Sequence, residues 1–213
     1  MAQAKDMSDA ARAEILERLR RGRRSVAAHS YVHRCATDGL DRLFAEKARA
    51  ANTQVSRIAD VDQAPEAIWA ALREANAAPR LHLSPESRLN ALPWQRAAGL
   101  TILRERPSGR DAAVSEADYG IAETGTLVFF SGPKTPSSWH FLPGHEFVLL
   151  PHDRILPRFE EVISRMGATM PATMNLVTGP SRTADIEQTI ERGAHGPREL
   201  HILLIRQTTY ARG

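Results

Sequence analysis

The sequence predicts an α/β protein, in which a mostly parallel sheet carries helices on both faces and follows an N-terminal helical arm. From about residue 53, short β-rich apolar runs alternate with segments whose apolar residues recur at helical spacing. Glycine and proline bound the runs at 126–131 and 146–150, as expected of buried strands. Before residue 53 the pattern is helical only. Residues 1–52 are therefore assigned to the arm and residues 53–213 to the α/β domain.

The arm is expected to contain two helices. The first spans residues 8–21 with Ser8 as its N-cap, and Gly22 interrupts it. The second spans residues 40–51, and Asn52 is suited to end it. Apolar residues lie at helical spacing in both, at Ile15, Leu16 and Leu19 and at Leu40, Leu43 and Phe44.

The domain is expected to alternate strands and helices. Asp62 and Pro65 open a helix in which Ile68, Ala71, Leu72 and Ala75 share one face. Further helices are expected at 158–166, at 183–192 and, as a short one, within 84–99. The expected strands are 55–58, 80–83, 100–103, 126–131, 146–150, 175–178 and 200–205. Their order in the sheet cannot be read from the pattern.

Composition narrows the class of protein. Among 213 residues, 42% are hydrophobic and 25% charged, which allows a sizeable core. The longest apolar runs, such as 147–150, are far too short to cross a bilayer, and no secretory signal is seen at the start. The expected compartment is the cytoplasm, and no membrane partner is expected.

Positive charge is concentrated in the arm. Residues 1–34 hold eight Lys/Arg and four Asp/Glu, whereas the rest of the chain has a balance of −1. Such a cluster is typical of a nucleic-acid or acidic-lipid site, or of a solvated or partner-facing helix. No aromatic side chains alternate with the arginines as stacking platforms would, which favours the second interpretation.

Cys35 is the only cysteine. An internal disulfide is therefore excluded, and so is an iron–sulfur cluster held by this chain's own thiolates, which normally takes four. His29 and His33 share a helical face, and His140, His145 and His152 recur in one region, but no zinc-binding spacing is present. No metal site is predicted, and the cofactor is unknown.

Gly179 begins the first candidate binding segment. There a short strand leads through a Gly-Pro turn into the expected helix at 183–192. Ser181, Arg182 and Thr183, with the Gly179 backbone, could hold a carboxylate or phosphate at the free N–H groups of that helix. The same residues could equally serve as helix caps. His195, after the helix, either faces a ligand near Arg182 or caps the helix end.

Glu123 lies in the second candidate segment, immediately before a predicted strand. A carboxylate there could act as nucleophile or general base, or it could accept backbone hydrogen bonds in a turn. Thr124, Gly125 and Thr126 complete the candidate ligand-binding set, with Gly125 permitting close backbone approach. Neither a Walker motif nor G-x-G-x-x-G occurs.

Three sequence words together resemble the LUD-domain family, and within it the lactate-utilization C branch. They are GIAETGTLV at 120–128, LPGHEFVLLP at 142–151 and GPSRTADIEQTIERGAHGPRELHILLI at 179–205. The resemblance covers about residues 40–206. It implies a fold similar to the glucosamine-phosphate deaminase, ribose-phosphate isomerase and CoA-transferase group. It also implies a role in oxidising L-lactate to pyruvate with two iron–sulfur partner proteins, this chain being the member without a cluster.

The resemblance assigns no catalytic residues, so three hypotheses stay open. The chain binds a small carboxylate or a phosphate-bearing ligand within the lactate-oxidising system. Alternatively, it is a CoA- or acyl-transferase-like enzyme with Glu123 as nucleophile. A third possibility is a non-catalytic assembly factor whose basic arm docks a partner. Fold alone does not choose among them.

Overall fold

The computed structural model describes residues 11–18, 21, 39–85, 87–132, 136, 138–166, 171–184, 190–192 and 196–207. The chain forms two compact units, Met1–Arg34 and Cys35–Gly213. In the first unit, residues 11–18 and 21 are helical, within the helix expected at 8–21. Exposed i,i+4 ion pairs join Arg18 to Glu14 and Arg21 to Glu17, each at 3.2 Å.

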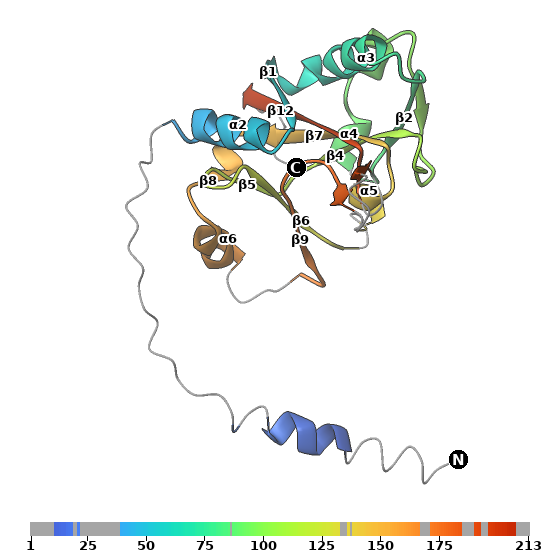
Figure 1. Ribbon diagram of the computed structural model, residues 1–213. Helices are drawn as coiled ribbons and strands as arrows, with labels where there is room; N and C mark the ends of the chain where they lie inside the picture. Colours follow the sequence, from blue (N-terminus) through green and yellow to red (C-terminus); the bar gives the residue numbers. More distant parts are fainter. Residues whose placement is uncertain are drawn as a thin grey trace, which may run out of the picture. The chain divides into compact units, whose positions relative to one another are not determined.

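A six-stranded sheet forms the centre of the second unit, and all its strands run parallel (Figure 1). In sheet order the strands are β1 (Gln54–Asp60), β12 (Glu199–Gln207), β7 (His145–Pro151), β4 (Ala112–Glu116), β2 (Arg80–Leu83) and β3 (Thr101–Leu103). The predicted parallel α/β class is confirmed. β4 was not expected, and its five residues are all buried.

Alternate residues of the central strands face two different cores. From β7 and β12, the side chains of Val148, Leu150, Ile202 and Leu204 enter one core, and those of Phe147, Leu149, Leu203 and Ile205 enter the other. Helix α3 (Ala64–Glu74) covers the second core through Ile68 and Leu72, with α4 (Ser87–Asn90) and the 3-10 turn η2 (Trp94–Arg96) beside it. Pro65 stands in the first turn of α3, as predicted.

The first core lies between the central sheet, helix α2 (Leu40–Ala50) and a second sheet. The order of the second sheet is β8 (Ile155–Leu156), β5 (Tyr119–Ile121), β6 (Thr126–Phe130) and β9 (Met174–Val177), with β6 antiparallel to both neighbours. Helix α6 (Phe159–Met166) lies beside this sheet (Figure 1). Its Val162 is buried with Ile121, Val128 and Leu156 of the sheet. One face of the central sheet therefore carries a helix and a sheet, where helices alone were expected.

The helix expected at 183–192 is a wrong prediction. β10 (Arg182–Ala184) pairs antiparallel with β11 (Ile190–Arg192) in a separate two-stranded ladder. The segment is rich in β-branched residues, and only Ile186 and Ile190 are large apolar residues at helical spacing. Pairing the two ends of the segment satisfies their backbone groups without the apolar stripe that a surface helix needs.

Helix α2 belongs to the second unit. Its residues Phe44, Ala45 and Ala48 are buried in the first core, so the compact unit begins before residue 53. Asn52, with φ of 63°, follows its last turn as expected. Within the described residues no helix combines the length and the apolar composition needed to cross a membrane.

Candidate functional site

The direction in which the chain crosses the central sheet reverses between β2 and β4. β3 lies on one side of β2, whereas β4 lies on the other and leads on to β7 and β12. In open α/β sheets, ligands bind beyond the carboxyl ends of strands at such a reversal. Ser84 follows β2 and Glu116 ends β4, so both lie at this edge.

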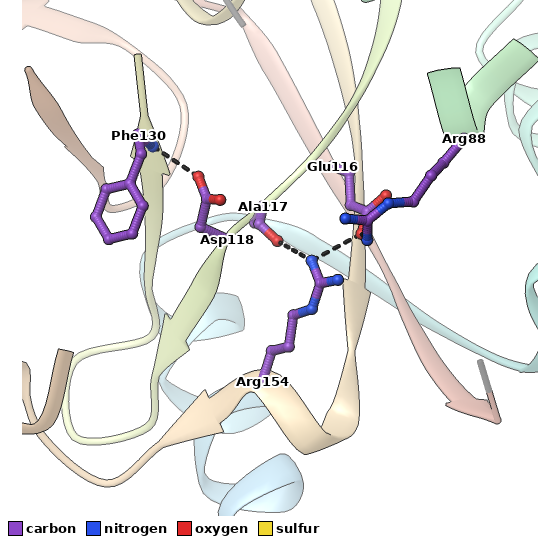
Figure 2. A network of polar contacts seen from close by, with 6 residues as sticks. All are labelled: Arg88, Glu116, Ala117, Asp118, Phe130 and Arg154. Atoms are coloured by element: carbon purple, nitrogen blue, oxygen red, sulfur yellow. Dashed lines mark hydrogen bonds and ion pairs between the residues drawn. The ribbon is translucent and has the colours of Figure 1, made fainter. Parts of the chain in front are cut away.

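Glu116 is the centre of a polar network at this edge (Figure 2). Its Oε1 accepts hydrogen bonds from Nη1 of Arg154 at 2.7 Å and from Nη1 of Arg88 at 3.0 Å. Nη1 of Arg154 also donates to the carbonyl oxygen of Ala117 at 3.3 Å. Arg88 comes from α4, and Arg154 ends the 3-10 turn η3 (His152–Arg154) after β7. Three separate segments thus meet at one carboxylate.

The network combines one buried anion with two accessible cations. The Glu116 side chain is 6% exposed, against 28% for Arg154 and 50% for Arg88. Two charge-assisted hydrogen bonds hold the buried carboxylate. The bonds that Arg154 makes to described residues all come from one of its nitrogens, Nη1, although a guanidinium offers five N–H donors. The partly exposed guanidinium of Arg154 thus offers further N–H donors at this edge, which suit a small anion.

Asp118 lies two residues beyond Glu116 and turns toward the smaller sheet (Figure 2). Its Oδ2 accepts a hydrogen bond from the Phe130 backbone N–H at 2.6 Å. Burial raises the pKa of Asp118 more than that bond and the charges of Arg154, His140 and Arg88 lower it. Asp118 therefore holds its proton more tightly than an ordinary aspartate does.

A second polar group is buried between the two sheets. Oε1 of Glu146 accepts a hydrogen bond from Ser115 Oγ at 3.0 Å and lies 2.7 Å from Nδ1 of His140. The His140 ring stacks on Phe129 with centroids 3.7 Å apart. His140 thus contacts a carboxylate and an aromatic ring. Among the described residues, no group of three His, Cys, Asp or Glu side chains is placed to hold a metal ion.

The predicted residues Glu123, Thr124 and Gly125 form the turn between β5 and β6. This turn lies at the end of β5 away from Asp118, so the structure does not bring Glu123 to the Glu116 network. Glu123 is exposed, and its backbone N–H donates to Pro157 O at 3.2 Å. Its role as a transferase nucleophile stays a prediction.

Gly125 and Gly179 both press against helix α2. Gly125 has φ of 70°, and a Cβ there would lie 2.3 Å from the Ala48 nitrogen. Gly179 has φ of 81°, and a Cβ would lie 2.3 Å from Ala51 O. The hydroxyl of Thr126 lies 2.7 Å from those of Thr124 and Thr178. The structure therefore brings together four of the predicted residues, Thr124, Gly125, Thr126 and Gly179. Close packing against α2 is enough to explain why glycine is needed at two of these positions.

The remaining predicted ligand-binding residues lie near the β10–β11 ladder. Ser181 N–H donates to Pro197 O at 2.8 Å, in a loop and not at a helix end. Arg182 and Thr183 belong to β10, so the helix N-terminus that was to support an anion there is absent. His195 lies outside the described residues. Whether Arg182 binds an anion stays a prediction.

Sequence reasoning missed Glu116, Arg88 and Arg154. The available signal was the pair of carboxylates at Glu116 and Asp118, shortly after the small apolar run Ala112 to Val114. Such a short run is a weak strand signal, but acidic residues after it fit the carboxyl end of a buried strand, where ligands bind in parallel sheets. The two arginines had no local signal.

Comparison with known proteins identifies the family. Residues 32–205 match the LUD domain. The chain belongs to the LUD domain family. The predicted resemblance is confirmed, and the match begins near the start of the second compact unit and ends within β12.

Curated relatives of this LUD domain chain align over part of their length. An uncharacterised protein of Neisseria meningitidis is 41% identical over 98 residues, which cover 45% of this chain and 42% of that protein. Lactate utilization protein C of Halalkalibacterium halodurans is 32% identical over 110 residues, 49% of this chain and 47% of that protein. Lactate utilization protein C of Macrococcus caseolyticus is 32% identical over 114 residues, which cover 51% of this chain and 49% of that protein. The aligned part thus spans about half of each curated relative or less.

A solved structure shares the fold. The crystal structure of a DUF162 family protein from Deinococcus radiodurans aligns with a TM-score of 0.61 and 18% identity. The alignment covers 81% of the LUD domain chain and 99% of that protein. At this identity the likeness concerns the fold alone.

Proposed function

We propose that this LUD domain protein takes part in lactate utilization, as a component of a multi-protein system that oxidises L-lactate to pyruvate. The observation that carries the proposal is its similarity to relatives named Lactate utilization protein C, within the family match over residues 32–205. Because the alignments span about half of those relatives, the activity, substrate and partners of the whole proteins are part of the proposal.

The partners we propose are iron–sulfur proteins. Oxidation of a 2-hydroxy acid to a 2-oxo acid releases two electrons, which need an acceptor. With Cys35 as its single cysteine, the chain cannot supply the four thiolates of a usual cluster. The clusters would therefore lie on partner proteins, and this chain would be the member without one.

The ligand we propose is a small carboxylate held at Arg154 and Arg88. Arg154 is accessible enough to bind a second carboxylate while Nη1 stays on Glu116. Glu116 fixes both guanidiniums from a buried position, which reduces the entropy lost when a ligand is bound. The site lies where the order of the parallel strands reverses, which is the usual ligand position in such sheets.

The cellular role is tested by an in-frame deletion of the gene. The deletion strain should fail to grow on L-lactate as sole carbon source but should grow normally on pyruvate, since only the oxidation step is lost. A plasmid copy should restore growth, and iron–sulfur proteins should co-purify with the tagged chain from lactate-grown cells. Unimpaired growth of the deletion strain on L-lactate would overturn the proposed role.

The site is tested by calorimetric titration of the purified chain with L-lactate and pyruvate. Arg154→Gln should weaken binding about tenfold or more, because a charge-assisted bidentate contact is lost. Arg154→Lys should give an intermediate loss, since it keeps the charge without the fork. Arg165→Gln on the exposed side of α6 removes the same charge and should change nothing. Wild-type affinity in a folded Arg154→Gln protein would exclude this site.

A further inference from the structure

A second recess opens at the carboxyl ends of β1 and β12. Its volume is about 540 Å³, within the usual range for small-molecule sites. It shares none of its lining residues with the Glu116 network, being lined by Asp41, Arg57, Ile58, Ala59, His152, Leu204, Ile205 and Arg206. Like the Glu116 network, it lies at the carboxyl edge of the parallel sheet, although away from the reversal between β2 and β4.

Strand register explains why the charged side chains gather there. β1 and β12 are parallel neighbours, with Arg57 opposite Leu204 and Ile58 opposite Ile205. Leu204 faces the core beneath α2, and Arg206, two residues on, points to the same side of the sheet. Arg57 also faces α2, because its Nη2 lies 3.2 Å from Oδ2 of Asp41 in the first turn of that helix.

The recess has a surplus of positive charge. Asp41 offsets one guanidinium through a half-exposed pair, which is worth little in water. Arg206 is exposed and makes no ion pair with any described side chain, and His152 adds a further charge when it is protonated. The N-terminus of α2 begins at Leu40, and its dipole favours an anion on the same side.

We propose that this recess binds a phosphate-bearing small molecule of nucleotide size. Two guanidiniums and an imidazole suit a doubly charged phosphate better than a single carboxylate, and each guanidinium can hold two oxygens. Apolar contact for an uncharged ring or chain attached to the phosphate comes from Ile58 and Ala59, the apolar lining residues that are not fully buried. The ligand is additional to the small carboxylate at Arg154.

The test titrates the full chain with adenosine monophosphate, using adenosine, pyrophosphate and inorganic phosphate as further probes. Adenosine monophosphate should bind, adenosine should bind at least tenfold more weakly, and added salt should weaken the phosphate probes. Arg206→Gln should reduce the affinity for adenosine monophosphate about tenfold or more. Arg206 is exposed, so the variant should fold and melt as the wild type does. Arg165→Gln is again the matched control.

Two further titrations separate this recess from the carboxylate site. Arg206→Gln should keep wild-type affinity for L-lactate, and Arg154→Gln should keep wild-type affinity for adenosine monophosphate. The proposal fails if no phosphate probe binds at millimolar concentration. It also fails if Arg206→Gln binds adenosine monophosphate as the wild type does, or if only Arg154→Gln reduces that binding. Failure of lactate binding alone would leave this recess standing.

Discussion

Glu116 and Asp118 lie two residues apart and have opposite electrostatic surroundings. Glu116 is buried and accepts charge-assisted hydrogen bonds from two guanidiniums. Asp118 receives one backbone N–H, and burial outweighs that bond and the nearby positive charges in setting its pKa. Perturbed carboxylates of this kind often occur in binding sites. Asp118 is thus the carboxyl group of this site whose pKa is raised.

Asp118 should make folding stability fall as pH rises. Because its pKa in the folded protein is raised above the ordinary 3.8, the folded state binds the proton more tightly than the unfolded state does. This contribution is fully present below pH 3.8 and is lost as pH rises through the folded pKa. Urea unfolding of the wild type and Asp118→Asn should therefore show a stability difference that declines above about pH 4 and then levels off.

Asp111 provides a control, because its contribution to folding stability should change with pH in the direction opposite to that of Asp118. Burial raises its pKa, but hydrogen bonds from Ser108 Oγ and N and the charges of His82 and Arg80 together lower it more. Its contribution to stability is present above pH 3.8 and is lost as pH falls through the folded pKa. If the folding stabilities of Asp118→Asn and the wild type differ by the same amount at every pH, the pKa of Asp118 is not raised.

At the scale of elements, helix α2 is the part on which distant segments converge. The β5–β6 turn contacts it through Gly125, and the loop after β9 contacts its C-cap residue Ala51 through Gly179. Neither position leaves room for a Cβ, and both have positive φ. The family-like words around these glycines are thus explained at least in part by packing against one helix.

Gly125→Ala should destabilise the protein more than Gly39→Ala does. Both glycines have φ between 70° and 74°, so alanine costs about 1–2 kcal/mol of conformational strain at either position. At Gly39 nothing lies within 4 Å of an added Cβ, whereas at Gly125 the Ala48 backbone is 2.3 Å away. Urea unfolding should show the larger loss at Gly125. If the two variants lose equal free energy of unfolding, the β5–β6 turn can move away from α2 with little loss of stability.

Elements with a strong local sequence pattern were predicted correctly, and those with a weak pattern were missed or mispredicted. Helices α2 and α3 have clear apolar faces, and their predicted bounds agree with the structure to within two residues. β4 is made of two alanines, a valine, a serine and a glutamate, which is no clear strand signal, and β8 has two residues only. The 183–192 segment lacked an apolar stripe, so long-range pairing decided its structure.

The candidate site could not be predicted as a whole. The sequence indicated a parallel sheet, and hence a carboxyl edge, but Arg88, Glu116 and Arg154 are separated by long stretches of chain. Strand order and the turns after β2 and β7 bring them together, and neither is encoded by a local pattern. The predicted anion site at Arg182 depended instead on a helix that the segment does not form.

At the scale of the molecule, truncation tests whether the second compact unit begins before α2. A chain lacking residues 1–34 should keep the melting temperature of the full chain, because the second compact unit remains whole. A chain lacking residues 1–52 should lose cooperative unfolding, because Phe44, Ala45 and Ala48 leave the first core. Calorimetry distinguishes the two. Cooperative unfolding of the shorter chain would place α2 outside the folding unit.

The same truncation tests the arm as a docking element. If the basic residues of 1–34 bind a partner, the chain lacking them should fold but should no longer co-purify with iron–sulfur proteins from lactate-grown cells. An intact complex would remove that role from the arm, without affecting the assignment of the fold.

The pairing of β1 with β12 has a consequence for how the chain folds during synthesis. β1 is an edge strand with β12 as its neighbour in the sheet, and β12 is made after residues 61–198. At usual translation speeds, β1 waits on the order of ten seconds for that neighbour. Throughout this interval its backbone groups can pair with other nascent chains, so a chaperone that covers β1 and α2 would protect the protein from aggregation.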